Sequence, residues 1–310
     1  IKSTLYYMTT FLNNIFNKRD KPISENSEKL YTRNLEKIND NKPVTELKYL
    51  KNIKEVLSKI QKYKPTTQRS FIIAICTVLK NNDDKLYNQY YEILSKMNND
   101  LKVNVDKSDK QNKNWIESDK IDGIYENLRK AVTNKSKTGA KESYDSLLHY
   151  MILSLYVLIP PRRNLDYALL VISSDMSDKK FNYLDFTKKQ FIFNNYKTQG
   201  TYESVIIDIP DDLFKVIKSY MLKHPHKAKL NNKKYHIHFL VNFYGEEIDK
   251  STQMTKLLSR IFGGLKIGSS MLRNMYLTNK YSGMMKELKS DVKDMSTSVD
   301  VALNNYIKKD

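Results

Sequence analysis

Residues 143–170 read SYDSLLHYMILSLYVLIPPRRNLDYALL. Apolar side chains dominate the first part of this stretch, and a pair of prolines ends the helical pattern because proline cannot continue a helix. We therefore expect a buried core helix over Ser143–Ile159, followed by a turn that presents Arg162 and Arg163. Serine and tyrosine interrupt the apolar run, which is shorter than the ~18 residues of a membrane span.

Downstream of this helix the pattern changes to short strands. Residues 191–193 (FIF) and 205–209 (VIIDI) are separated by a turn at Asn194–Gly200, which predicts a β-hairpin. Further strands are expected over 181–186 and 239–241. Helical periodicity returns over 213–222, 252–262 and 269–280, and the chain is expected to be helical and polar after Tyr281. The predicted fold class is mainly α with a small antiparallel sheet.

Upstream, the periodicity predicts several short helices with basic faces. One covers 24–38 with Ser24 as N-cap, and others cover 70–79 and 84–97. Residues 98–114 are almost free of apolar side chains, as in an interdomain linker. The expected organisation is an N-terminal helical arm (1–21), a helical unit (22–100), a linker (101–114) and a second unit (115–310).

Composition limits the kinds of partner and site. The chain has 310 residues and a formal charge of +18, from 53 Lys and Arg against 35 Asp and Glu, which favours a polyanionic partner such as nucleic acid. An AT-rich gene would produce some of the same lysine excess. Cys76 is the only cysteine, so no internal disulfide can form and a reducing, intracellular compartment is expected. No metal-ligand or cofactor motif is present, so we expect neither.

Four residues in a fixed order form a set suited to breaking a phosphodiester without metal. Arg163 and Arg273 carry planar guanidinium groups that fit phosphoryl oxygens, and Lys197 can protonate a leaving oxygen. Tyr306 lies 33 residues after Arg273 and can act as the nucleophile. Each residue alone is common, and only the order and spacing of the set favour this chemistry.

The motifs around these residues resemble those of tyrosine recombinases, above all those of large DNA viruses, virophages and Polinton-like elements. The resemblance implies a helical core-binding domain followed by an α+β catalytic domain. It rests on five stretches: KYKPTTQRSFIIAICTVLK (62–80), LIPPRRNLDYALL (158–170), NNYKTQGTYESVIIDIP (194–210), SSMLRNMYLT (269–278) and MSTSVDVALNNY (295–306).

The resemblance assigns roles to the first three catalytic candidates. An arginine with an acidic residue three positions later clamps the scissile phosphate in this family, and Arg163 with Asp166 fits that register better than Arg162 does. A lysine in a β-hairpin acts as general acid, which corresponds to Lys197. The arginine of an H-x-x-R motif holds a second phosphoryl oxygen, which corresponds to Arg273. An arginine that merely pairs with Asp166 is the alternative at the first position.

The remaining candidates include two departures from the family pattern. Ser270 occupies the histidine position of H-x-x-R, three residues before Arg273 and expected on the same side of the helix. Thr297, nine residues before Tyr306, occupies the position of a second histidine or tryptophan. Neither can act as a base near pH 7, so the acceptor of the tyrosine proton stays open. The DNA-binding candidates are Lys64, Thr66, Thr67, Arg69 and Arg162.

The function implied is a site-specific recombinase or integrase that acts through a 3′-phosphotyrosine. Its partner would be double-stranded DNA, and a homo-oligomer, with a tetramer in the synapse, would assemble there. The expected location is the host nucleus or a viral replication site. Two alternatives stay open: a type IB topoisomerase with the same chemistry on one protomer, and a DNA-binding protein of this fold that has lost catalysis.

Overall fold

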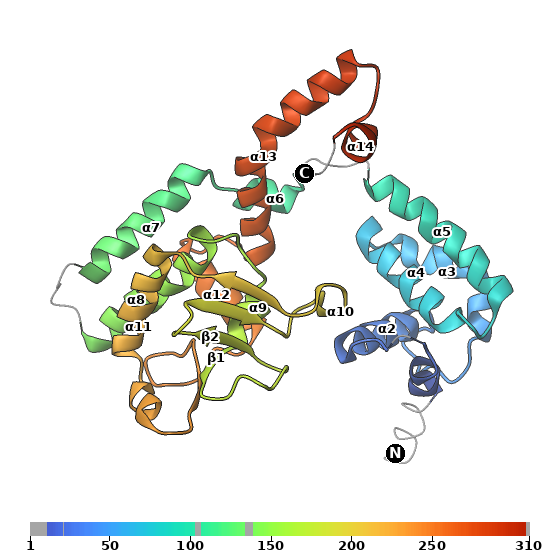
Figure 1. The fold of residues 1–310 in the computed structure, drawn as a ribbon. Coiled ribbons are helices and arrows are strands. Elements are labelled where there is room, and N and C mark those ends of the chain that lie inside the picture. The colour runs from blue at the N-terminus through green and yellow to red at the C-terminus, as the bar shows by residue number, and fades with distance from the viewer. Residues whose placement is uncertain (1–10, 21, 103–106, 134–138, 308–310) are drawn as a thin grey trace. The chain divides into compact units, whose positions relative to one another are not determined.

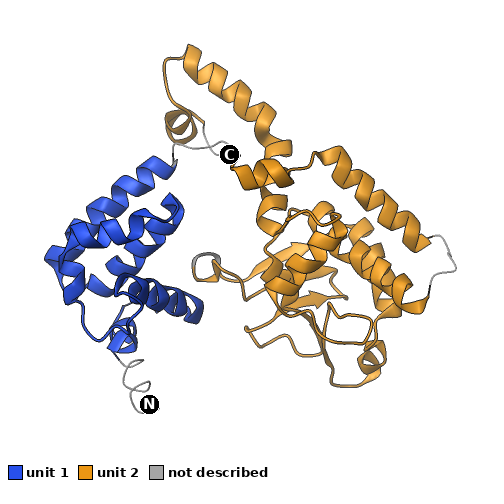
Figure 2. Cartoon of the chain, turned by 180° about the vertical axis from the view of Figure 1, so that it is seen from behind, with its two compact units in different colours: residues 1–106 blue, residues 107–310 orange. Residues whose placement is uncertain are grey.

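A computed structural model describes residues 11–20, 22–102, 107–133 and 139–307. The chain divides into two compact units, residues 1–106 and 107–310 (Figure 2). Residues 1–10 of the expected arm and 103–106 of the expected linker lie outside the described residues.

The first unit is helical. Ser24 caps its first long helix, as predicted, because the Ser24 hydroxyl accepts a hydrogen bond from the Ser27 N–H. The helices are α2 (Glu25–Ile38), the 3₁₀ turn η1 (Lys48–Lys51), α3 (Ile53–Gln61), α4 (Pro65–Leu79) and α5 (Asp84–Lys102). Helix α4 begins earlier than the expected Ser70, because a proline at the first helical position loses no hydrogen bond.

A continuous apolar core holds these helices together. Helix α4 lies against both α2 and α5 and buries most of its length, including Phe71 and Ile75, which are fully covered. Residues 11–17 are also helical, and Leu12 and Phe16 bury their side chains in the same core. The described part of the N-terminal arm therefore packs with the first unit.

Part of the stretch expected as a linker is structured. Residues Asp109–Asn114 form helix α6. The Ser108 hydroxyl accepts a hydrogen bond from the Gln111 N–H, and the Gln111 side chain accepts one from the Ser108 N–H. This reciprocal cap explains why a segment without apolar residues is helical here.

The second unit places the predicted core helix at its centre. Helix α8 (Ala140–Val157) lies against three other helices of this unit (Figure 1): α7 (Ser118–Thr133), α11 (Asp211–Lys223) and α12 (Ser251–Ile261). The short helix α9 (Asn164–Ala168) follows the two prolines and contacts α12. Helix α13 (Ser269–Asp294) covers the helix expected over 269–280 and continues into the helical, polar stretch expected after Tyr281.

A five-stranded sheet completes this unit, in the order β4-β3-β2-β1-β5. Strands β3 (Gln190–Phe193) and β4 (Val205–Asp208) pair antiparallel with Phe193 opposite Val205, which confirms the predicted hairpin. A short helical turn, α10 (Gln199–Tyr202), lies within the connection. Strand β2 (Asn182–Asp185) pairs antiparallel with β3.

Two strands differ from the sequence prediction. Strand β1 (Leu170–Ser173) was not expected, and it pairs parallel with β2, so the sheet is mixed rather than purely antiparallel. All four β1 residues are buried, which removes the alternation that marks a half-exposed strand. Strand β5 (His236–His238) ends just before the expected Phe239–Val241 and pairs antiparallel with β1.

The fold is thus mainly helical with a small sheet, as the sequence predicted. Among the helices that the structure describes, none combines the length and apolar character needed to cross a membrane.

Candidate active site

The turn after α8 places two adjacent arginines in different surroundings. The pair Pro160–Pro161 ends α8, and Arg163 becomes the N-cap residue of α9 in an extended conformation. The Arg163 side chain is half-exposed and makes no hydrogen bond or ion pair with another residue that the structure describes. Its guanidinium is therefore available to an anion.

Arg162 faces inward instead. Its Nε donates a hydrogen bond of 3.1 Å to Oδ2 of Asp166, and its guanidinium carbon lies 3.9 Å from the centre of the Phe193 ring. Burial raises the pKa of Asp166 above its usual value, and the charges of Arg162 and Arg163 offset part of that rise. The pairing with Asp166 that the sequence left open for Arg163 is thus made by Arg162.

Arg163 and Arg273 line the same pocket, although they are far apart in sequence. The pocket has a volume of about 290 Å³ and is formed by the turn before α9, the β3–β4 hairpin and the first turns of α13. Its lining residues are Pro160, Pro161, Arg162, Arg163, Asp166, Tyr196, Thr198, Val205, Ile207 and Arg273. Three guanidinium groups against one carboxylate leave an excess of positive charge, which favours an anionic ligand.

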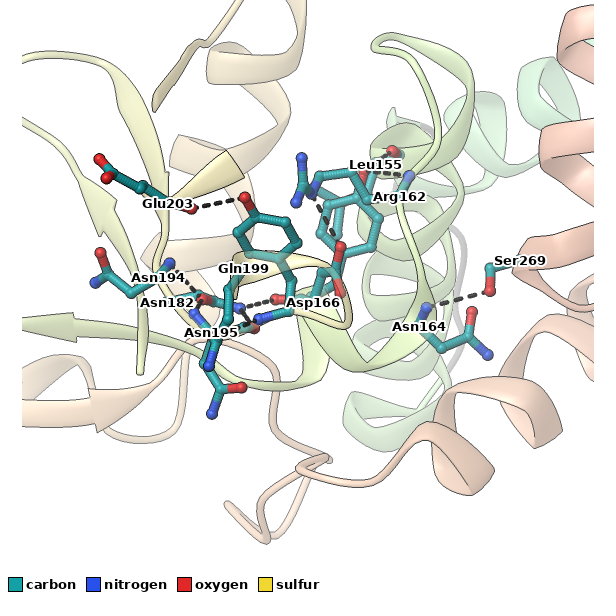
Figure 3. A network of polar contacts seen from close by, with 12 residues as sticks. Leu155, Arg162, Asn164, Asp166, Asn182, Asn194, Asn195, Gln199, Glu203 and Ser269 are labelled. Carbon is teal, nitrogen blue, oxygen red and sulfur yellow. Dashed lines mark hydrogen bonds and ion pairs between the residues drawn. The ribbon is translucent and has the colours of Figure 1, made fainter. Parts of the chain in front are cut away.

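Lys197 lies beside this pocket rather than in its lining. It is exposed on the turn after β3, and its neighbours Tyr196 and Thr198 both line the pocket. The Tyr196 hydroxyl donates a hydrogen bond of 2.6 Å to the carbonyl of Glu203 (Figure 3). This hydrogen bond joins the two ends of the loop that carries Lys197, next to the arginines.

Ser270 and Arg273 are neighbours on helix α13 but line different pockets. Ser270 is exposed and lines a different pocket of about 600 Å³, with Lys256, Lys266 and Asn274. The preceding residue, Ser269, is buried, and its Oγ accepts a hydrogen bond of 3.2 Å from the N–H of Asn164 (Figure 3). Ser269 was not singled out from the sequence. It lies four residues before Arg273 and Ser270 lies three before it, and both spacings make neighbours on a helix.

The C-terminal candidates lie outside the arginine pocket. Thr297 is half-buried in the turn after α13, where its N–H donates to the Val292 carbonyl at 2.8 Å. Tyr306 ends a π-helical turn, Ala302–Tyr306, and its side chain is 58% exposed. Helix α13 leads away from the sheet, and the chain turns back after its far end to form α14 (Val299–Val301) (Figure 1). Neither candidate lines the pocket.

The DNA-binding candidates of the first unit gather at the start of α4. Lys64 is its N-cap residue, and Lys64, Thr66 and Thr67 are exposed. Arg69 is half-buried, and its Nε donates a hydrogen bond to the side chain of Asn98 on α5. Three of these side chains are free to meet a phosphate backbone, whereas Arg69 is partly engaged within the unit.

Within the described residues, no group of three or more His, Cys, Asp or Glu side chains is placed to hold a metal ion. The arginine pocket contains no histidine in its lining.

Comparison with known proteins gives a likeness to solved structures. No family model matches the chain, and no curated protein matches it. The crystal structure of XerA recombinase is similar over 90% of this chain and 85% of its own, at 14% sequence identity and a TM-score of 0.35.

Proposed function

We propose that this protein is a tyrosine recombinase that cuts and rejoins double-stranded DNA. The observation that carries the proposal is that Arg163 and Arg273, selected separately from the sequence, line one pocket. Two guanidinium groups in one pocket can hold the two non-bridging oxygens of a phosphate and stabilise the charge that develops on them. Kinship with the recombinases of large DNA viruses and virophages, and action in a host nucleus or viral replication site, are part of this proposal.

The reaction requires two proton transfers around one phosphorus atom. The Tyr306 oxygen attacks the phosphorus, the bond to the 5′-oxygen breaks, and a 3′-phosphotyrosine forms. The Tyr306 proton passes to solvent water, and Lys197 supplies a proton to the leaving 5′-oxygen. A 5′-hydroxyl from a partner strand then reverses the step. The ester conserves the energy of the broken bond, so the cycle needs no nucleotide cofactor.

Tyr306 must enter the arginine pocket for this chemistry to occur. It would do so in a homo-oligomer, a tetramer on two DNA sites, in which the C-terminal segment of one protomer enters the pocket of another. Exposed apolar side chains around Tyr306 support this, because Leu303 and Ile307 are about half-exposed in the isolated chain. Exposed apolar side chains that gather on one segment are typical of contact surfaces.

A second candidate function is DNA binding without catalysis. The position of Tyr306 outside the arginine pocket favours it, as does the replacement of both customary histidines by Ser270 and Thr297. Such a protein would hold a phosphate in the pocket and form no covalent bond. A type IB topoisomerase would form the bond but act as one protomer on DNA.

A nicked suicide substrate separates these functions. A pool of duplexes with randomised centres would carry a nick just beyond each possible cleavage site, so that a short 5′-hydroxyl fragment diffuses away and the ester cannot reverse. Protein–DNA adducts that survive denaturing electrophoresis would be recovered and sequenced. A recombinase gives adducts at a defined sequence. If the protein binds DNA but forms adducts at no sequence, it is neither a recombinase nor a type IB topoisomerase. Protomer count on the recovered site would distinguish recombinase from topoisomerase.

A further inference from the structure

We propose that Asn182 is a positioning residue that fixes the Lys197 loop against helix α9. This inference rests on the proposed function, because it assigns a role in the use of Lys197 as general acid. Asn182 is the first residue of β2 and was not singled out by its sequence context. Its side chain joins the two segments that carry Arg163 and Lys197.

The Asn182 amide makes four hydrogen bonds (Figure 3). Its Nδ2 donates to the carbonyls of Asp166 at 2.8 Å and Asn195 at 3.0 Å. Its Oδ1 accepts from the N–H groups of Asn194 at 2.9 Å and Asn195 at 2.8 Å. The side chain is fully buried, so no water competes for these contacts.

Only an amide of this length can satisfy this arrangement. A side-chain amide offers two donors and two acceptor lone pairs, and Asn182 uses all four. An aspartate at this position would lose both donors and turn a carboxylate toward two carbonyl oxygens. A buried polar network in which every group is paired holds a single geometry, because any displacement leaves a group without a partner.

The geometry links the phosphate-holding residue to the general acid. Asp166 is in the short helix capped by Arg163, and Asn195 precedes Lys197 by two residues. The bond from the Tyr196 hydroxyl to the Glu203 carbonyl closes the loop from the other side. Glu203 has a φ of 55°, a left-handed conformation that a non-glycine residue keeps only where surrounding contacts hold it. Lys197 is therefore on an anchored loop rather than on a free hairpin tip.

Anchoring matters because proton transfer depends on placement. A general acid acts within hydrogen-bond reach of the atom it protonates, and a misplacement of about 1 Å can cost roughly 10²-fold in rate. A variant that loosens the Asn182 contacts should therefore lose the contribution of Lys197 while the arginines keep their charge. The defect should depend on whether the leaving group needs a proton.

A sulfur leaving group tests this dependence. Replacing the bridging 5′-oxygen by sulfur gives a thiolate leaving group, and because a thiol has a pKa of about 8.5 it departs without protonation. The substrate would be the duplex recovered as an adduct with the wild-type protein, made with oxygen or sulfur at the scissile position. Single-turnover adduct formation would be measured for wild type, Asn182→Asp, Tyr196→Phe and Lys197→Ala.

Tyr144→Phe serves as the control for general destabilisation. The buried Tyr144 hydroxyl bonds to Tyr220 and to the Val241 carbonyl and has no hydrogen bond to the Lys197 loop. Its loss should lower the unfolding midpoint of the second unit, which fluorescence of Trp115, the only tryptophan, reports directly. Its cleavage of both substrates should stay within a few-fold of wild type.

Asn182→Asp is expected to slow cleavage of the oxygen substrate by about 10²-fold or more. It should cleave the sulfur substrate at a rate within a few-fold of wild type. Lys197→Ala should behave in the same way on both substrates. Tyr196→Phe should show a smaller defect with the same recovery, and it keeps the test open if Asn182→Asp does not fold. Equal defects on both substrates, or no defect on oxygen, would overturn the role of Asn182. Absence of adducts from the wild-type protein on either substrate would instead overturn the proposed function.

Discussion

Arg162 and Asp166 form an ion pair at 3.1 Å in which the carboxylate side chain is only 2% exposed. The adjacent Arg163 makes no such pair among the described residues and lines the pocket with Arg273. Two neighbouring arginines therefore have separable roles, since one neutralises a buried charge and the other is open to a ligand.

Substitution of these arginines should separate catalysis from stability. Arg163→Ala should reduce adduct formation by about 10²- to 10³-fold, the cost of losing one donor to a developing oxyanion, with little change in unfolding. Arg162→Ala should lower the free energy of unfolding of the second unit by about 3 kcal/mol, because it leaves Asp166 buried without its partner. Single-turnover cleavage and urea unfolding followed by Trp115 fluorescence would measure the two effects. Equal losses of activity with unchanged stability would contradict this division.

Replacement of Tyr306 tests the nucleophile. Tyr306→Phe should abolish covalent adducts and leave duplex affinity within a few-fold, since it removes one hydroxyl and no charge. Adducts would be detected on denaturing gels and affinity by fluorescence anisotropy. If adducts persist, the tyrosine must be another one, and Tyr276 and Tyr281 on α13 would be tested next.

The two serines at the start of α13 should behave differently. Ser270→Ala should change cleavage only a few-fold, because Ser270 is exposed and lines a different pocket from Arg273. Ser269→Ala should cost about 1–3 kcal/mol of unfolding free energy, because it leaves the buried N–H of Asn164 without an acceptor. Single-turnover cleavage and urea unfolding of both variants would measure these two effects. A Ser270→Ala variant as inactive as Tyr306→Phe would show that Ser270 has an essential role.

His224 should make the second unit sensitive to acid. Burial and the neighbouring His226 lower the pKa of His224 to about 4. Its Nδ1 accepts the His226 N–H at 3.1 Å and its Nε2 lies 3.2 Å from the His238 carbonyl, so a second ring proton would face a donor. The folded state resists protonation of His224, whereas the unfolded chain does not. The contribution of neutral His224 to the free energy of unfolding is therefore fully present above pH 6.5, and about 3 kcal/mol is lost as the pH falls toward 4.

The measurement is urea unfolding followed by Trp115 fluorescence between pH 7 and pH 4. His224→Gln should be less stable at pH 7 and lose the component of the pH dependence due to His224. A substitution of the exposed His236, His236→Gln, should keep the wild-type slope. If His224→Gln retains that slope, another group causes the acid sensitivity.

Binding to DNA should depend strongly on salt. If six or more phosphates are neutralised, affinity should fall by about 10³-fold or more between 50 and 200 mM salt, because binding releases condensed counterions. Lys64→Ala should reduce the slope of log affinity against log salt by about 1, whereas Lys64→Arg keeps the charge and should leave it unchanged. Fluorescence anisotropy titrations would measure both. A flat salt response would contradict phosphate binding by the basic faces.

Local sequence determined much of this fold. Apolar periodicity located α8, α11 and α12, and Ser24 marked the start of α2, because helix faces and caps are properties of neighbouring residues. Alternation and a polar turn located the β3–β4 hairpin for the same reason. The resemblance of the ordered motifs to a known family also selected the two arginines that line one pocket.

Tertiary structure decided what depends on contacts between distant residues. Strand β1 is buried along its whole length, so no alternation distinguished it from a helix before β2 and β5 paired with it. Arg162 turns inward onto Asp166 and Phe193, which lie near it only in the folded chain. The Asn182 amide likewise acquires its four partners only when β2, α9 and the hairpin loop meet. Sequence specifies each segment through neighbours along the chain, whereas a site is specified by side chains that only folding makes neighbours.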